Sequence, residues 1–248
     1  NHLANVDIFN DTLNLIENID TNSVTTKHNF TEIVSGFNIR QGEISVIPLD
    51  TISAAQQTLG RTCVLNMASS KTAGGGVRDG RVAQEECLFR CTNLAETIIQ
   101  DFYPLSITEG LYTKDAIIIK NSDYEYIEPV SIDCVTVPAI DKTKNIIDDW
   151  SVVKHGTGWE INTNYEYNTK MKIKLMLSLA YLNNCDNIIL GAWGCGVFKN
   201  DPQTIANFFH EILVLEEYKY MFNKVIFAVI NDNNSVGNNY EIFKNILS

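Results

Sequence analysis

Residues 62–86 read TCVLNMASSKTAGGGVRDGRVAQEE, and this stretch decides the fold class. Its first six residues form an apolar run with β-branched members, which is typical of a strand covered on both faces. A polar loop and three consecutive glycines follow, and a helical apolar period begins at Gln84. A strand, a glycine loop and a helix in this order predict an α/β fold with a ligand at the carboxyl edge of the sheet.

The same alternation of strand-like and helical periods continues along the chain. The predicted strands are 43–49, 62–67, 116–120, 131–137, 187–192 and 224–230. The predicted helices are 5–18, 51–59, 84–102, 165–182, 202–220 and 240–247, whereas 121–129 and 141–164 are expected to be irregular. We predict a single domain over residues 1–248, with a mixed sheet between helix layers and a helical extension, residues 1–40, packed on it.

Composition and charge argue against several classes of protein. A net charge of -11 argues against a general nucleic-acid binder, because such a protein needs a basic face. No apolar run approaches the roughly 18 residues of a membrane span, and the first residues lack the pattern of a signal peptide. We therefore expect an intracellular monomer, cytoplasmic or, in a eukaryote, nuclear, that contacts neither membranes nor nucleic acids directly. An anionic ligand would have to be held by local donors, chiefly backbone N–H groups.

The six cysteines and four histidines form no metal or redox motif. No CxxC or CxxH spacing occurs, so we expect no metal site. Cys87 and Cys91 lie four residues apart on the apolar stripe of a predicted helix, which favours core packing over metal or redox chemistry. The histidines show no pairing pattern, so we do not expect any of them to be catalytic.

The first candidate site joins the glycines to two carboxylates. Gly74, Gly75 and Gly76 permit positive φ angles and close approach of backbone to a ligand, although a flexible surface turn also explains them. Glu85 and Glu86 follow in the first turn of a helix, where acids also simply favour the helix dipole. As sequence neighbours they would approach a substrate from one side, so one would act as acid and then base while the other grips hydroxyl groups. Their mutual repulsion raises both pKa values and the helix N-terminus lowers them, and the sequence leaves the balance open.

The second candidate site is LGAWGCGVFKNDP at residues 190–202. A strand runs into a glycine-rich turn, and Asp201 and Pro202 begin a helix as N-cap and first-turn residue. Such a turn can cradle a phosphate with backbone N–H groups, although its spacing fits neither the GxGxxG fingerprint nor a Walker A loop. Phe198 is either a platform for a nucleoside or a core residue. Trp193 is more ambiguous and can simply pack in the core.

The GGG triplet, the short gap and the QEE triplet together resemble the signature of the poly(ADP-ribose) glycohydrolases. With GAWGCGVFKNDP, the surrounding sequence resembles their bacterial or microbial type, which is built on a macrodomain. The resemblance implies a macrodomain-like three-layer sandwich, ADP-ribose or poly(ADP-ribose) on modified proteins as the partner, no cofactor, and hydrolysis of ribose–ribose O-glycosidic bonds. It assigns Glu86 as the catalytic acid and Glu85 as the companion that contacts ribose hydroxyls. The substrate-binding residues that it implies are Asn66, Gly74, Gly75, Gly76, Val77, Gln84, Gly194, Cys195, Gly196, Val197 and Phe198.

Some residues depart from the family pattern. Residues 71–73 replace the more usual Asn-Pro approach to the glycines, and Met67 stands where Phe is common. The gap between the glycines and QEE carries Arg78, Asp79 and Arg81, which can alter access or the preferred substrate.

Several alternatives stay open at this point. The chain can be a hydrolase of mono-ADP-ribose on protein or nucleic acid, or a non-catalytic macrodomain that only binds ADP-ribose. The strand–helix alternation also fits a Rossmann-type dehydrogenase, but the glycine spacing of that fold is missing. Asp50 is expected to cap the second helix, with a ligand-facing role as the alternative. Residues 231–232 are expected to form a plain turn, with the border of an adenine pocket as the alternative.

Overall fold

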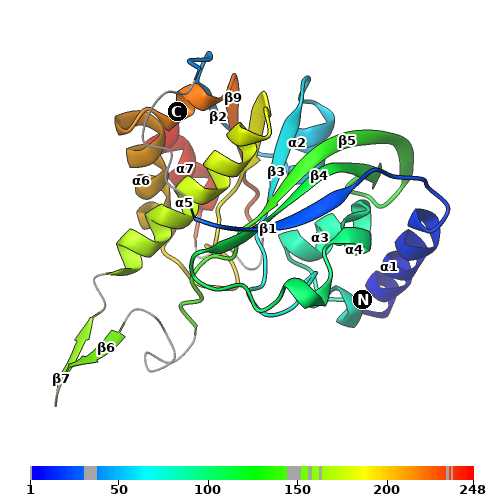
Figure 1. Ribbon diagram of the computed structural model, residues 1–248, viewed down its shortest axis with the longest axis horizontal. Coiled ribbons are helices and arrows are strands. Elements are labelled where there is room, and N and C mark those ends of the chain that lie inside the picture. Colours follow the sequence, from blue (N-terminus) through cyan, green and yellow to red (C-terminus); the bar gives the residue numbers. More distant parts are fainter. Residues whose placement is uncertain are drawn as a thin grey trace.

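A seven-stranded mixed sheet runs through the molecule, with helices on both of its faces (Figure 1). The structure, a computed structural model, describes residues 2–30, 38–143, 152–155, 158–161, 164–232, 235 and 237–248. The strand order is β1-β4-β5-β3-β8-β9-β2. The strands are β1 (Val24–Asn29), β2 (Glu43–Ile47), β3 (Thr62–Asn66), β4 (Glu109–Lys120), β5 (Tyr126–Thr136), β8 (Asn187–Leu190) and β9 (Lys224–Ala228). Neighbours from β5 to β2 pair in parallel, whereas β4 pairs antiparallel with both β1 and β5.

Two apolar clusters, one on each face of the sheet, make the sandwich three layers thick. The helices are α1 (His2–Ile16), α2 (Thr51–Gln56), α3 (Gln84–Cys91), α4 (Leu94–Thr97), α5 (Asn164–Leu182), α6 (Pro202–His210) and α7 (Asn239–Leu247). One cluster packs Phe209 of α6 and Phe243 of α7 against the sheet. The other packs Phe9 of α1 and Leu88 of α3 against the opposite face. The predicted α/β sandwich with a mixed central sheet is therefore confirmed.

The central parallel strands are buried along their whole length. Every residue of β3 and β8 is buried, as their nearly continuous apolar sequences predict for strands covered on both faces. Each of the predicted runs 43–49, 62–67, 187–192 and 224–230 contains one observed strand. Among the described helices, none combines the length and apolarity that crossing a membrane requires.

The predicted helix 84–102 is wrong, because the helix ends at Cys91. Thr92 is extended, with φ −132° and ψ 172°, and forms a bridge with Ile118 of β4. The backbone N–H of Asn93 donates to the carbonyl of Ile117 at 3.2 Å, and the Asn93 side chain accepts from the Ile117 N–H at 2.9 Å. Pairing with β4 therefore replaces the next helical turn, and only the short helix α4 and a 3-10 turn follow.

Two other predicted helices end early. The predicted helix 202–220 ends at His210 as α6, and a π-helical turn, Glu211–Leu215, and a 3-10 turn, Tyr218–Met221, follow it. Glu217 lies between these turns with φ +64°. This left-handed backbone conformation does not occur within a right-handed helix, so the helix cannot continue through Glu217. The predicted helix 51–59 ends at Gln56.

The strand predictions are also incomplete at one side of the sheet. The extension 1–40 is not wholly helical, because its residues 24–29 form β1 and pair with β4; residues 31–37 lie outside the described chain. β4 begins seven residues before the predicted run 116–120, and β5 begins at Tyr126, inside a segment expected to be irregular. The second such segment contains a two-stranded hairpin, β6 (Val152–His155) and β7 (Gly158–Ile161).

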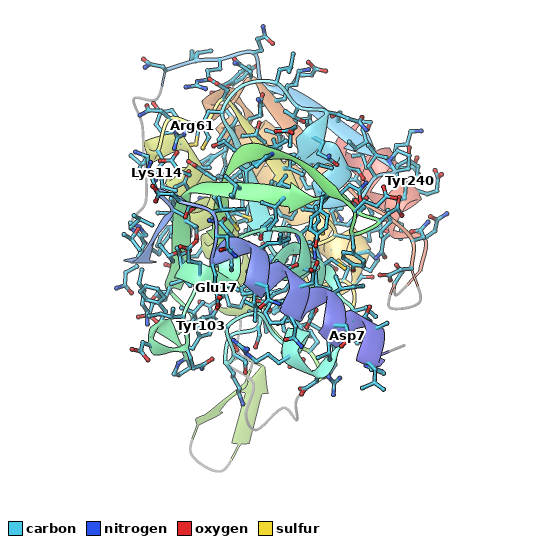
Figure 2. The ribbon with its side chains drawn as sticks, turned by 90° about the vertical axis from the view of Figure 1, so that its right-hand side faces the viewer. Asp7, Glu17, Arg61, Tyr103, Lys114 and Tyr240 are labelled. Atoms are coloured by element: carbon cyan, nitrogen blue, oxygen red, sulfur yellow. The ribbon has the colours of Figure 1, made fainter. Side chains whose placement is uncertain are left out.

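The N-terminal helix α1 packs behind the glycine-rich loop. Figure 2 shows α1 across the face turned to the viewer, with Asp7 labelled within the helix and Glu17 just past its C-terminal end. Asn5 donates from Nδ2 to the carbonyl of Gly80 at 3.0 Å. The Phe9 ring is buried under the guanidinium of Arg78, whose central carbon lies 5.6 Å from the ring centroid. These contacts place α1 against the loop that leads to the carboxylates, which it supports.

Candidate active site

A cavity of about 640 Å³ opens where the loops after β3 and β8 meet. These two strands are parallel neighbours, so their carboxyl ends lie at the same edge of the sheet. The volume lies within the roughly 300–1,000 Å³ of small-molecule sites. The predicted site residues that line it are Gly75, Gly76, Gln84, Glu85, Glu86, Gly194, Gly196, Val197 and Phe198. The structure therefore brings both candidate sites together in one cavity.

The glycine loop lies directly on the two carboxylates. Gly74 and Gly75 have φ angles of +72° and +56°, in the left-handed region that glycine tolerates best. A Cβ on Gly75 would lie 2.6 Å from Oε1 of Glu86 and 2.9 Å from Oε2 of Glu85, so a larger residue would displace them. Gly75 is thus required by its close approach to the acids, which a flexible surface turn does not explain.

Glu86 is held by one carboxylate oxygen. Its Oε1 accepts a hydrogen bond of 2.8 Å from the backbone N–H of Gly76. Its Oε2 is buried and has no hydrogen-bond partner among the described residues. A buried carboxylate oxygen without a partner is costly unless a ligand or water satisfies it. One oxygen of Glu86 is therefore fixed in place, and the other is left for a ligand.

Glu85 is also buried, and its environment raises its pKa. Oε2 accepts from the backbone N–H of Ser69 at 2.7 Å, and Oε1 accepts from Nδ2 of Asn66 at 3.3 Å. The pKa of Glu85 is raised to about 8, chiefly by burial and also by the neighbouring Glu86, while the hydrogen bond from Ser69 opposes both effects. For Glu85, desolvation therefore outweighs the hydrogen bonds that favour the charged form, and the side chain is mostly protonated at neutral pH.

Gln84 and Asn66 fix the carboxylates from behind. Gln84 accepts from the Met67 N–H at 2.9 Å and donates to the Leu65 carbonyl at 2.6 Å, which joins the start of α3 to the end of β3. Asn66 is fully buried, does not line the cavity, and also donates to Oγ1 of Thr136 at 3.3 Å. Their polar atoms serve mainly to position the neighbouring groups, and direct substrate contact by either residue stays a prediction.

The loop Gly194–Phe198 presents backbone donors to the cavity. Gly194 has φ +75°, and a Cβ there would lie 2.7 Å from the Cβ of Ala139. Asn200 holds the turn by donating to the carbonyls of Gly194 at 3.0 Å and Ile140 at 2.8 Å. Within the described residues, no acceptor is hydrogen bonded to the backbone N–H groups of Gly194, Gly196, Val197 and Phe198. Clustered unpaired N–H groups of this kind make an anion-binding concavity.

The aromatic and apolar members of the predicted set have different positions. Trp193 is fully buried and donates from Nε1 to the Val137 carbonyl at 2.9 Å, so it packs in the core. Phe198 lines the cavity and packs partly against the core, so its position fits both a nucleoside platform and a core residue. Gly74, Val77 and Cys195 do not line the cavity but support the two loops from behind. For Gly74 the reason is steric, since a Cβ there would meet the Phe89 ring at 2.7 Å.

Some other residues that line the cavity were predicted from the sequence patterns only as an alternative or were not predicted at all. Asp50 accepts from the Ser53 N–H at 3.0 Å, which confirms the helix cap, and it also lines the cavity. Asp232 lines the cavity at the end of β9, which favours the pocket-border alternative for this turn. Asn239 was missed, and only its place at the start of the last helix, α7, could have indicated it.

The cysteines contribute no metal site among the described residues. All six thiols are free and five are buried, as expected for packing groups. No group of three or more His, Cys, Asp or Glu side chains in the described part of the chain is arranged to hold a metal ion.

The fold and the site together define a macrodomain-type α/β protein, in which a turn with unpaired backbone N–H groups lies in the same cavity as a glycine loop that closes on two glutamates. Residues 6–120 match the family model for the catalytic domain of microbial-type PARG, the poly(ADP-ribose) glycohydrolases. The poly(ADP-ribose) glycohydrolase of Thermomonospora curvata has a TM-score of 0.78 at 20% identity, covering 97% of this chain and 98% of that chain. The enzyme of Deinococcus radiodurans, solved in complex with ADP-ribose, has a TM-score of 0.69 at 26% identity, covering 83% of this chain and 85% of that chain. No curated protein sequence matches the chain.

Residues 6–120 are thus similar to the catalytic domain of the microbial-type poly(ADP-ribose) glycohydrolases, and the chain shares the fold of two such enzymes. The resemblance to this family, which GGG and QEE carry within the matched residues, is thereby confirmed.

Proposed function

We propose that the chain hydrolyses the ribose–ribose O-glycosidic bond of poly(ADP-ribose) and releases ADP-ribose, with Glu86 as general acid and then general base. The observation that carries this proposal is the state of the Glu86 carboxylate. Gly76 fixes Oε1, and Oε2 is buried at the cavity without a partner among the described residues. A positioned group of this kind, within hydrogen-bond reach of the reacting oxygen, is what general acid–base catalysis needs.

The chemical steps follow from this geometry. Glu86 donates a proton to the bridging oxygen as the bond from that oxygen to the anomeric carbon breaks, through an oxocarbenium-like state. The leaving unit departs with a free hydroxyl group. The carboxylate of Glu86 then takes a proton from a water molecule whose oxygen bonds to the anomeric carbon, which restores the acid and completes the hydrolysis. Glu85, mostly protonated at neutral pH, can bind ribose hydroxyls without adding a second full negative charge.

The diphosphate site of the released unit is supplied by the free backbone N–H groups of Gly194, Gly196, Val197 and Phe198. Such donors neutralise a diphosphate locally in a chain whose net charge is -11. The same charge is unfavourable for direct contact with nucleic acid. The structure of the Deinococcus radiodurans enzyme in complex with ADP-ribose supports this class of ligand for the cavity.

Product analysis with polymer of defined length tests the proposal. The wild-type protein is expected to release ADP-ribose, detected by chromatography. Glu86→Gln is expected to lower the rate by about 10²- to 10⁴-fold, the usual contribution of a general acid–base group. It should still bind ADP-ribose, because glutamine keeps the hydrogen bond from Gly76. Asp79→Asn is the matched control, since Asp79 is exposed and does not line the cavity.

Two outcomes separate the alternatives. A Glu86→Gln protein that matches wild type would contradict the assigned role. Wild-type protein that binds ADP-ribose but releases none from polymer would instead favour the non-catalytic macrodomain. Offering mono-modified protein beside the polymer identifies a hydrolase of single modifications.

A further inference from the structure

Arg81 is the only lysine, arginine or histidine among the described residues that line the cavity. The other charged residues of that lining are Asp50, Glu85, Glu86 and Asp232. Each unit of an ADP-ribose polymer carries a diphosphate, so a long anionic substrate must approach an acidic protein and an acidic cavity. Within the described lining of the cavity, this arginine is therefore the one side chain that offers the polymer a full positive charge.

The backbone of Arg81 is fixed at the reacting end of the cavity. Its N–H donates to the Gly76 carbonyl at 3.1 Å, and its carbonyl accepts from Nη2 of the buried Arg90. Its stem lies on Gly76, where an added Cβ would meet Cγ of Arg81 at 2.9 Å. Gly76 is also the residue whose N–H holds Glu86. The arginine therefore stands next to the carboxylate at which the glycosidic bond is expected to break.

The guanidinium group of Arg81 is available to a ligand. No hydrogen bond or ion pair joins it to any residue that the structure describes, and the side chain is exposed. A guanidinium can donate two parallel hydrogen bonds to phosphate oxygens, a geometry that a lysine does not offer. Its chemistry thus fits a phosphate group that lies just outside the position of the broken bond.

We propose, on the basis of the proposed function, that Arg81 binds the diphosphate of the leaving ADP-ribose unit and makes the site selective for polymer. The diphosphate of the released unit has its own donors in the N–H groups of Gly194–Phe198. Beyond Glu86 lies the leaving group, which in a polymer is a second nucleotide with its own diphosphate. In a mono-modified protein the leaving group is an amino-acid side chain, which gives Arg81 no phosphate to bind.

A pair of arginine variants tests this assignment. The substrate is a two-unit ADP-ribose oligomer at low salt, and the readouts are kcat/KM and the dissociation constant of ADP-ribose alone. Arg81→Gln is expected to lower kcat/KM for the two-unit oligomer about tenfold, as loss of a charge-assisted hydrogen bond does, and to change the ADP-ribose dissociation constant less than about twofold. Salt screens exposed charges, so the difference should shrink at high salt.

Arg78→Gln is the matched control from the same loop. Arg78 is exposed, does not line the cavity, and faces Phe9 of α1. This variant should leave both readouts near wild type. The proposal is overturned if Arg78→Gln loses as much as Arg81→Gln, or if Arg81→Gln weakens ADP-ribose as much as the oligomer. In the latter case Arg81 serves the released unit.

A binding measurement makes the test independent of turnover. In a Glu86→Gln background, adding Arg81→Gln should weaken binding of the two-unit oligomer about tenfold and leave ADP-ribose binding unchanged. If wild type releases no ADP-ribose but this selective loss is observed, the proposed hydrolysis fails and the role of Arg81 stands. If hydrolysis occurs and no selective loss is observed, the role of Arg81 fails alone.

Discussion

Glu85 is buried in the folded protein and exposed to water in the unfolded chain, so its proton affinity differs between the two states. Its pKa is about 8 in the fold against a reference value of 4.5, because desolvation penalises the charged form. Between these two values the folded protein holds a proton that the unfolded chain has lost. This group therefore makes stability fall as pH rises from 4.5 to about 8, and it adds no slope outside that window.

Glu85→Gln is expected to remove this slope. The glutamine oxygen can still accept the hydrogen bond from Ser69 but has no proton to lose. Relative to wild type, the variant should gain stability between about pH 5 and about pH 9, by a few kcal/mol at roughly 1.4 kcal/mol per pKa unit. Urea unfolding at both pH values measures the difference. An equal difference at the two pH values would contradict the raised pKa.

At the scale of elements, α1 acts as a brace for the glycine loop. Phe9 is 1% exposed and packs with the cluster that contains Leu88 of α3. Arg90 of α3 is fully buried and donates from Nε to the Asn5 carbonyl at 3.2 Å. It also donates to the carbonyl of Arg81, so α1, the loop before α3 and the last turn of α3 are joined through one side chain.

Phe9→Ala is expected to lower the free energy of unfolding by about 3–5 kcal/mol, the usual cost of removing a buried phenylalanine. It should also reduce activity, because the ring supports the loop that holds Glu86. Leu3→Ala, on the same helix but 74% exposed, should change the free energy by less than about 0.5 kcal/mol. Denaturant unfolding of the two variants measures this. Equal stabilities would show that α1 does not brace the loop.

Elements whose form depends on distant partners were the ones that sequence patterns failed to predict. The apolar stripe of 84–102 continues past Thr92, but β4 supplies the partners that end the helix there. β1 reads VTTKHN and has no apolar alternation, because it is an edge strand that is largely exposed. The buried parallel strands were predicted well, since burial on both faces leaves a continuous apolar signal in the sequence.

In the molecule as a whole, the site lies where two loops meet. The strands that precede these loops, β3 and β8, are neighbours in the sheet. The sequence identified both loops, and the resemblance carried by their residues assigned Glu86. The sequence did not separate residues that line the cavity from residues that support it. Val77 and Cys195, for example, were predicted to bind substrate but lie behind the lining. That distinction depends on side-chain direction and on the packing of α1 and α7, which no local pattern contains.

The most direct test of the central claim is a crystal structure of the Glu86→Gln protein with ADP-ribose. We predict the anomeric carbon of the distal ribose within about 3–3.5 Å of the side chain at position 86, the separation that reaction requires. We also predict the diphosphate against the N–H groups of Gly194–Phe198. A nucleotide bound in the cavity with its distal ribose away from position 86, or bound outside the cavity, would contradict the account.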